Sequence, residues 1–289
     1  SRSGTKEMIE VAIVGGGIAA AAAVLELRKK GRSLCVMAPE SQCGSDKIGE
    51  SLSPAANQTL QKLGVWDAFC KLGNRESQSS YSAWGMSQIS ERNAFGNLDG
   101  AGWQINRSEF EALLWEHAPH RRVSSVLNHT EHDGKRWKLT TKDGEKIEAA
   151  FVLDCSGRAS VVGRCFFPRL RVDRQLAAYT FLTQKDGGIT PTPGSMIESR
   201  ADGWWYSALL PDDRMVVTQF FDADLIDRGI HREESAWLEA VSETEFTEMR
   251  IRTAGYAVEG LPTLIDASTT WLEKAAGDYW VAAGDAAAA

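Results

Sequence analysis

The sequence lacks features that would place it in several common protein classes. It has no apolar run near the roughly 20 residues of a membrane-spanning helix, and its apolar stretch at residues 11–25 follows acidic rather than basic residues, unlike a secretory signal. Basic clusters are also absent, because 32 Lys and Arg face 39 Asp and Glu, a formal net charge of −7. Nucleic-acid binding needs clustered positive charge. We therefore expect no nucleic acid, no membrane span and a cytoplasmic location.

Cysteine is scarce, and the sequence contains no pattern typical of a metal site or a hydrolase. The five cysteines are scattered without a C-x-x-C pair, which favours free thiols in a reducing compartment. Histidines pair at positions 117 and 120 and at 129 and 132, but Pro119 interrupts the first pair and the second has no cysteine nearby. We expect no metal site. No G-x-S-x-G nucleophile motif occurs.

The composition is that of an ordinary globular protein. Apolar residues make up 43% of the chain and charged residues 25%, proportions that exclude disorder and a long coiled coil. A length of 289 residues allows one large domain or two smaller ones.

The N-terminal region is predicted to form a β-α-β unit. An apolar run at residues 9–14 is followed by a glycine-rich turn at residues 15–20, a helical stretch reaching Lys30, and a second apolar run at residues 34–37. The unit is about 30 residues long, the length this element needs. It predicts a dinucleotide-binding turn.

The turn has the pattern G-x-G-x-x-A. Gly15 permits the tight turn, Gly17 allows the backbone to approach a pyrophosphate, and Ala20 keeps the helix close to the strand. An acid normally contacts the ribose from the end of the second strand. Ala38 occupies that position, and Glu40 is the nearest candidate.

Two further regions predict β-sheet. Between residues 123 and 153, three β-like runs are separated by two Asp-Gly pairs, which predicts a three-stranded meander. The third run ends at Asp154-Cys-Ser-Gly157, an acid and a glycine at the carboxyl end of a strand. Four later runs, at residues 177–183, 195–200, 204–210 and 215–221, predict an antiparallel sheet.

An ordered set of motifs carries a resemblance to a known family. They are the Gly15 to Ala20 turn, Lys47-Ile-Gly-Glu-Ser51, Arg107 at a predicted helix start, Asp154-Cys-Ser-Gly157, Gly203-Trp-Trp-Tyr-Ser-Ala-Leu-Leu-Pro211 and Gly284-Asp285. With them the sequence resembles FAD-dependent monooxygenases of the para-hydroxybenzoate hydroxylase fold, in the branch related to flavin-dependent halogenases. That branch includes tryptophan-hydroxylating enzymes of tryptophylquinone maturation.

The resemblance implies an α/β fold. A Rossmann-like FAD-binding domain with a β-meander would comprise residues 1–78, 101–166 and 275–289, and a substrate domain built on an antiparallel sheet would comprise residues 79–100 and 167–274. Because a further segment normally follows in the family, we expect the natural chain to continue beyond Ala289.

The resemblance also implies the site residues. Arg107 would pair with the cofactor phosphates, Asp285 would bind the ribityl hydroxyls, and a helix beginning at Ala286 would point its positive end at the flavin. The substrate pocket would include Trp84, Trp204 and Tyr206. The full expected cofactor set is Gly15, Gly16, Gly17, Ala19, Ala20, Lys47, Gly49, Glu50, Ser51, Arg107, Asp154, Gly157, Gly284, Asp285 and Ala286.

The chemistry implied by the resemblance is hydroxylation of an aromatic substrate through a flavin hydroperoxide, with the cofactor performing the difficult step. The substrate would be an aromatic small molecule, or a tryptophan in a peptide, carrier or partner protein. Only one dinucleotide turn is present, so the electrons would come from transiently bound NAD(P)H or from a separate flavin reductase.

Three alternatives remain open at this point. Halogenases of the family carry W-x-W-x-I-P, which here becomes Trp204 to Pro211 without that pattern, so halogenation is disfavoured. A flavin-dependent reductase or saturase would use the same fold without incorporating oxygen. A non-catalytic interaction protein would explain the absence of an acid at Ala38.

Overall fold

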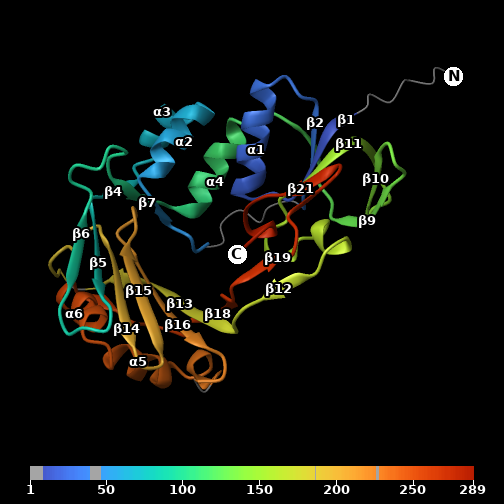
Figure 1. Ribbon diagram of the computed structural model, residues 1–289. Coiled ribbons are helices and arrows are strands. Elements are labelled where there is room, and N and C mark those ends of the chain that lie inside the picture. The colour runs from blue at the N-terminus through green and yellow to red at the C-terminus, as the bar shows by residue number, and fades with distance from the viewer. Residues whose placement is uncertain (1–8, 40–46, 186, 226–227) are drawn as a thin grey trace. The chain divides into compact units, whose positions relative to one another are not determined.

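The computed structural model describes residues 9–39, 47–185, 187–225 and 228–289 (Figure 1). The chain divides into two compact units: unit 1 comprises residues 1–45, 111–172 and 269–289, and unit 2 comprises residues 46–110 and 173–268. The sequence analysis instead assigns residues 46–78 and 101–110 to the FAD-binding domain. In the structure these segments make most of their contacts within unit 2.

Unit 1 is built on a parallel sheet, as the β-α-β pattern predicts. Its parallel strands run in the order β8 (Arg121–Val123), β2 (Leu34–Met37), β1 (Ile9–Val14), β11 (Lys146–Asp154) and β21 (Trp280–Ala282), and β20 (Ala276–Gly277) pairs antiparallel with β21. Helix α1 (Ile18–Lys29) buries small and apolar side chains from Ala20 to Leu25. The α/β fold class is confirmed.

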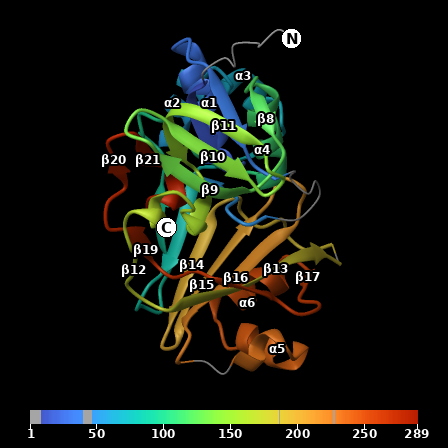
Figure 2. The same ribbon diagram turned by 90° about the vertical axis from the view of Figure 1, so that its right-hand side faces the viewer.

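The predicted meander extends this sheet. β9 (Leu127–His132), β10 (Trp137–Thr141) and β11 pair antiparallel in sequence order (Figure 2). Gly134 and Gly144 both have positive φ angles, the conformation that an Asp-Gly hairpin turn requires. The remaining elements of unit 1 are a short antiparallel pair, β12 (Arg169–Arg171) with β19 (Thr270–Leu272), and the 3₁₀ turns η1 (Gly157–Ala159), η2 (Gly163–Cys165) and η4 (Gly284–Ala286).

Unit 2 contains the second predicted sheet. Its order is β17 (Tyr256–Ala257), β13 (Gln175–Gln184), β16 (Met215–Asp222), β15 (Gly203–Leu209), β14 (Ser195–Arg200), β5 (Ser79–Ala83) and β6 (Ser90–Asn93), with β18 (Thr263–Asp266) also paired to β13. Every pairing is antiparallel except that of β5 with β14. A separate small sheet has the order β3 (Ser51–Leu52), β7 (Gly102–Gln104) and β4 (Arg75–Ser77).

Five helices and a 3₁₀ turn complete the described chain in this region. They are α2 (Ala55–Leu63), α3 (Trp66–Cys70), α4 (Arg107–Glu116), which crosses from unit 2 into unit 1, η3 (Arg228–His231), α5 (Glu234–Ser242) and α6 (Phe246–Thr253). The predicted start of α4 is confirmed, because the side-chain oxygen of Asn106 accepts hydrogen bonds from the Ser108 and Glu109 amides.

The large sheet of unit 2 has two different faces, because successive side chains of a strand alternate. One face packs against α5 and α6, where Trp205 stacks on Trp237 of α5. The opposite face carries Trp204 and Tyr206 of β15 and, on the neighbouring strand β16, Phe220. We call these the helix face and the aromatic face.

A buried carboxylate on the helix face caps α6. Glu198 of β14 is 4% exposed, and its two oxygens accept hydrogen bonds from the amides of residues 245–247 at 2.7 to 3.1 Å and from the Thr247 hydroxyl at 2.9 Å. The cap therefore comes from a strand far away in sequence rather than from the helix's own N-cap residue. It fixes α6 to the sheet.

We expect Glu198→Gln to lower the free energy of unfolding by about 1 to 3 kcal/mol, because one carboxylate oxygen becomes a donor that faces other donors. Urea unfolding measures this change. The matched control is Glu245→Gln, since Glu245 is exposed and makes no side-chain cap bond. Equal effects of the two substitutions would contradict the assigned cap.

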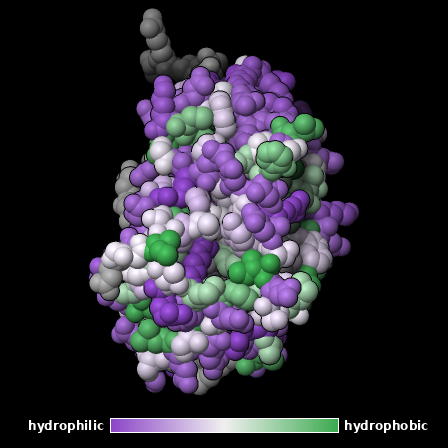
Figure 3. Space-filling view, turned by 90° about the vertical axis from the view of Figure 1, so that its left-hand side faces the viewer, coloured by the Kyte–Doolittle hydropathy of each residue, from purple (hydrophilic) through white to green (hydrophobic). Residues whose placement is uncertain are grey.

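Exposed apolar side chains are present on the surface. On the face shown in Figure 3 they form separate patches among polar side chains. Among the exposed apolar residues, Phe95 and Leu98 are almost fully accessible, while Trp84, at 58% exposure, lies at the end of β5. Small separate patches are common on protein surfaces, so these alone do not define a partner interface.

Candidate functional site

The first glycine of the turn is fixed by close backbone packing. Gly15 has a φ of +122°, and a Cβ at this position would lie 2.1 Å from the carbonyl oxygen of Cys155. Its amide donates to Met37 O at 2.9 Å, and the Cys155 amide donates to Val14 O at 2.7 Å. Only glycine fits here. The turn is thereby held to both β2 and the end of β11.

The third glycine of the turn, Gly17, has open space beside it instead of close backbone packing. A Cβ at Gly17 would meet no atom within 4 Å, and α1 begins at the next residue without a side-chain cap or an acid in its first turn. The Trp115 indole of α4 donates to Gly16 O at 2.9 Å and orients the turn from outside. Open space before an uncapped helix start is what a pyrophosphate requires. This part of the chain fits FAD.

The end of β2 supplies no acid. Ala38 is buried, and a Cβ on Gly16 would lie 3.0 Å from the Ala38 Cβ. A larger side chain at either position would press on the other, so the small residue is explained by packing against the turn. Glu40, the other candidate for the ribose contact, lies outside the described residues.

The carboxylate of Asp154, at the end of β11, binds neighbouring groups of the protein. Its carboxylate is fully buried and accepts hydrogen bonds from the Val162 and Gly163 amides, both at 2.9 Å, and from the amide and hydroxyl of Ser156 at 3.1 and 2.5 Å. We therefore revise its expected role from direct cofactor ligand to positioning residue. It fixes the loop that begins at Gly157, where φ is +66°.

The same carboxylate affects the neighbouring thiol. Burial raises the pKa of Cys155 to about 12, and the negative charge of Asp154 also raises it. The thiol is therefore protonated at neutral pH, and Cys155 contributes packing rather than a nucleophile.

The Gly284-Asp285 motif lies beside the start of α1. A Cβ on Gly284 would be 3.0 Å from the Ala19 Cβ, so the two expected cofactor motifs of unit 1 are neighbours. Asp285 is exposed and Ala286 is buried. Residues 284–286 form a 3₁₀ turn, and the helix expected to begin at Ala286 stays a prediction.

Arg169 holds this 3₁₀ turn in place, a role that the sequence did not predict. Its guanidinium donates to the carbonyl oxygens of Asp285 and Ala286 at 2.8 and 3.1 Å, to Thr270 Oγ1 at 2.8 Å, and to the Ser160 hydroxyl. Ser160, also buried, donates to Ala286 O at 2.7 Å. The Gly284-Asp285 segment is therefore positioned by the strand pair that carries Arg169.

The expected cofactor residues of unit 2 gather around Arg107. Gly49 has a φ of +96°, and a Cβ there would lie 2.3 Å from an Arg107 guanidinium nitrogen, which donates to Gly49 O at 3.4 Å. The Gly49 amide donates to a carboxylate oxygen of Glu50 at 2.7 Å. Ser51 pairs with β7, and Lys47 is half-buried at the start of the segment. The structure thus brings the Lys47–Ser51 motif and Arg107 together.

Gln104 is a further candidate that the sequence did not reveal. It lies on β7 opposite Ser51 and is fully buried, yet neither its amide nitrogen nor its oxygen has a hydrogen-bond partner among the described residues. A buried amide without partners is costly. Gln104 lies beside Ser51 but has no accessible surface, so a polar group of the cofactor would reach and satisfy it only if the surrounding side chains move.

We expect Gln104→Leu to raise the stability of the cofactor-free protein by about 1 kcal/mol, because an unsatisfied buried amide is removed. The same substitution should weaken FAD binding about tenfold, equivalent to about 1.4 kcal/mol. Thermal unfolding without FAD and a fluorescence titration with FAD measure the two effects. Gln61→Leu, at an exposed position on α2, is the control. Unchanged FAD affinity in Gln104→Leu would exclude Gln104 from the site.

The three expected substrate-pocket residues share the aromatic face of unit 2. Trp204 stacks on Phe220 with ring centroids 3.9 Å apart and an interplanar angle of 6°, and Trp84 lies 6.3 Å from Trp204. The Tyr206 hydroxyl is buried beside Glu50 and Ser51. Burial and the negative charge of Glu50 raise the pKa of the Tyr206 phenol. The aromatic face therefore adjoins the Glu50–Ser51 segment.

A metal-binding cluster and a membrane-spanning helix are both absent from the described residues. They contain no group of three or more His, Cys, Asp and Glu side chains placed to hold a metal ion. None of the described helices is long and apolar enough to span a bilayer.

Sequence comparisons match this chain to flavoproteins. A family model described as FAD binding domain matches residues 8–182, more than half of the chain. LodB of Marinomonas mediterranea, named as an FAD-dependent oxidoreductase, is 26% identical over 252 residues, covering 82% of this chain and 67% of LodB. Asperlicin C monooxygenase of Petromyces alliaceus is 28% identical over 177 residues, covering 56% of this chain and 38% of that enzyme.

Structural comparisons agree with the fold. The myxobacterial chondrochloren halogenase CndH has a TM-score of 0.84 at 17% identity, covering 97% of this chain and 69% of that one. The peptidyl tryptophan dihydroxylase QhpG has a TM-score of 0.71 at 20% identity, covering 98% and 61%. The chain therefore belongs to the FAD binding domain family, has the para-hydroxybenzoate hydroxylase fold, and is an FAD-dependent oxidoreductase of the monooxygenase type.

Proposed function

We propose that this chain hydroxylates an aromatic ring, with a tryptophan in a peptide or partner protein as the favoured substrate class. The observation that carries the proposal is the aromatic face of unit 2, where Trp84, Trp204 and Phe220 form a partly exposed cluster. Stacked rings of this kind bind other flat, electron-rich rings well. The name of QhpG, a peptidyl tryptophan dihydroxylase of the same fold, supports a peptide-bound ring.

Each unit, taken by itself, contains groups suited to binding a cofactor. In unit 1 the α1 start at Gly17 and the Gly284–Ala286 turn provide backbone amides and open space. In unit 2 the guanidinium of Arg107 and the unsatisfied amide of Gln104 provide charge and hydrogen bonds. We assign these groups to binding and orientation, since the fold supplies position and electrostatics while the cofactor supplies the redox chemistry.

FAD, once bound and reduced by two electrons from NAD(P)H or a flavin reductase, would supply the oxygen chemistry: one atom of O₂ would enter the ring, and the other would leave as water with two protons. The residues of this chain perform the remaining tasks. Trp204 and Phe220 orient the substrate ring by stacking, and apolar rings around it exclude water. Tyr206 remains protonated at neutral pH, because the pKa of its phenol is raised, and its side chain packs against the apolar residues beside it.

The test is oxygen-isotope incorporation. The FAD-loaded protein is supplied with NADH and a flavin reductase, ¹⁸O₂ and a tryptophan-containing peptide, and the peptide is analysed by mass spectrometry. Hydroxylation adds one ¹⁸O atom per event, and Trp204→Ala should slow it about tenfold because the stacking partner is lost. The matched control is Trp271→Ala, an exposed tryptophan of unit 1.

Other products would favour the alternatives. A halogenated peptide in the presence of bromide would indicate a halogenase, and a product two hydrogens heavier without ¹⁸O would indicate a reductase or saturase. Consumption of reductant without any modified peptide, phenol or indole would contradict aromatic hydroxylation. Absence of FAD binding would favour the non-catalytic interpretation.

A further inference from the structure

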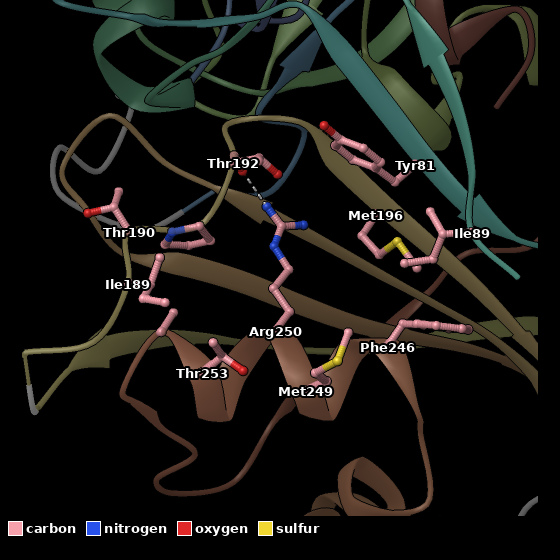
Figure 4. A pocket seen from close by; sticks show the side chains of 12 residues that line it. Tyr81, Ile89, Ile189, Thr190, Thr192, Met196, Phe246, Met249, Arg250 and Thr253 are labelled. Atoms are coloured by element: carbon pink, nitrogen blue, oxygen red, sulfur yellow. Dashed lines mark hydrogen bonds between the residues drawn. The ribbon is translucent and has the colours of Figure 1, made fainter.

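A cavity of about 400 Å³ lies within unit 2, on the helix face of the large sheet. Its apolar lining comes from the strands, from α6 and from the loop at residues 187–194, and Arg250 of α6 extends into the middle of it (Figure 4). The volume is within the range of small-molecule sites in proteins. Its main apolar lining residues are Ile89, Ile189, Pro191, Met196, Phe246 and Met249.

The loop over the cavity is held at both ends. A Cβ on Gly188 would lie 2.3 Å from the Ala254 carbonyl carbon, and a Cβ on Gly194 would lie 2.3 Å from Ser79 O, so both glycines pack directly on backbone. The Arg250 guanidinium also donates to Thr192 O and Gly194 O, both at 2.8 Å. The rim of the cavity is thus fixed by the protein itself.

The cation in the cavity, Arg250, has no acidic partner among the described residues. The hydrogen bonds recorded for the Arg250 guanidinium go to neutral oxygens: two loop carbonyls and, at 3.1 Å each, the carbonyl and hydroxyl of Ser207. Among the described residues that line the cavity, none is acidic. Burial lowers the pKa of Arg250 to about 10, so the guanidinium stays charged at neutral pH. Arg250 is half-buried, and a partly desolvated charge without an acidic partner costs free energy that an anion would offset.

This cavity is distinct from the aromatic face. Met196 lines it and pairs with Ser207 of β15, whereas Tyr206, the preceding residue on that strand, belongs to the opposite face. The substrate proposed above would bind the aromatic face. We therefore expect the cavity to bind a different ligand.

We propose that the cavity is a second binding site, for a small amphipathic carboxylate whose apolar part occupies the Met196–Met249 side and whose carboxylate pairs with Arg250. Apolar walls around a single cation select this class, because an uncharged ligand leaves the cation unpaired and an inorganic anion leaves the apolar walls exposed. The site is independent of the proposed hydroxylation.

The test uses octanoate as the probe, with octanol and octylamine as its neutral and cationic analogues. The FAD-loaded protein is labelled with methyl-¹³C methionine, and the NMR signals of its six methionines are followed during titration. We expect octanoate to shift the Met196 and Met249 signals, while those of Met37 and Met215, which do not line the cavity, stay unchanged. Octanol should bind at least about tenfold more weakly, since it lacks the charge, and octylamine should not bind.

Two substitutions on α6 test the charge under matched conditions. Arg250→Met should weaken octanoate binding at least about tenfold while leaving octanol binding within about twofold. Arg252→Met, the same change at an exposed position where Arg252 pairs with Glu248, should leave both unchanged. Thr253→Trp should block both probes by filling the cavity without removing Arg250.

Three results would overturn the proposal. Equal affinity for octanoate and octanol, shifts confined to other methionines, or unchanged octanoate binding in Thr253→Trp would each exclude the assigned site. Hydroxylation activity plays no part in these readouts, so failure of the proposed function leaves the test intact.

Discussion

Gly15→Ala should unfold or severely destabilise unit 1, lowering the free energy of unfolding by about 3 kcal/mol or more. The added methyl would lie 2.1 Å from Cys155 O, and alanine is strained at a φ of +122°. Because the obstructing atom is backbone at the end of β11, the strain cannot be relieved by rotating a side chain. Urea unfolding of the cofactor-free protein measures the loss.

Gly17→Ala is the matched control and separates folding from binding. A methyl at Gly17 meets no atom within 4 Å, and its φ of −89° suits alanine. We expect unchanged stability without FAD, within about 0.5 kcal/mol. We also expect FAD affinity at least about tenfold weaker, because the methyl occupies the space for the pyrophosphate. Wild-type affinity in Gly17→Ala would contradict the placement of the phosphates.

Asp154→Asn is expected to lower the free energy of unfolding by about 2 to 4 kcal/mol. The amide group of asparagine must direct its hydrogens either at the Val162 and Gly163 amides or at Ser156, and each of these already donates to the carboxylate. Thermal or urea unfolding measures the effect.

The control for this substitution is Asp143→Asn, at an exposed hairpin turn where Asn-Gly is as suitable as Asp-Gly. A small effect in Asp154→Asn, comparable with that in Asp143→Asn, would show that the buried carboxylate does not hold the loop after β11.

Much of the fold could be predicted because its signals are local. The two Asp-Gly pairs specify the meander, and their glycines have the positive φ that the turns need. The glycine turn between two apolar runs specifies β1, α1 and β2. The parallel pairing of β5 with β14 could not be derived this way, because it joins segments about 115 residues apart and no local pattern encodes it.

The site was less predictable where roles depend on tertiary contacts. Asp154 was expected to face the cofactor, but its four donors come from the loop that follows, whose path the sequence does not reveal. Gln104 and Arg169 carry no motif of their own. Gln104 is notable only because it is buried without partners, and Arg169 only because its guanidinium reaches residues more than 100 positions away.

The measurement that tests the central claim most directly is retention of flavin. The purified chain is incubated with FAD, desalted, and its visible absorbance compared with its protein content, alongside Gly17→Ala. We predict about one FAD per wild-type chain and a large loss in the variant. A wild-type protein that leaves the column colourless, or a variant that retains as much flavin as the wild type, would contradict the account.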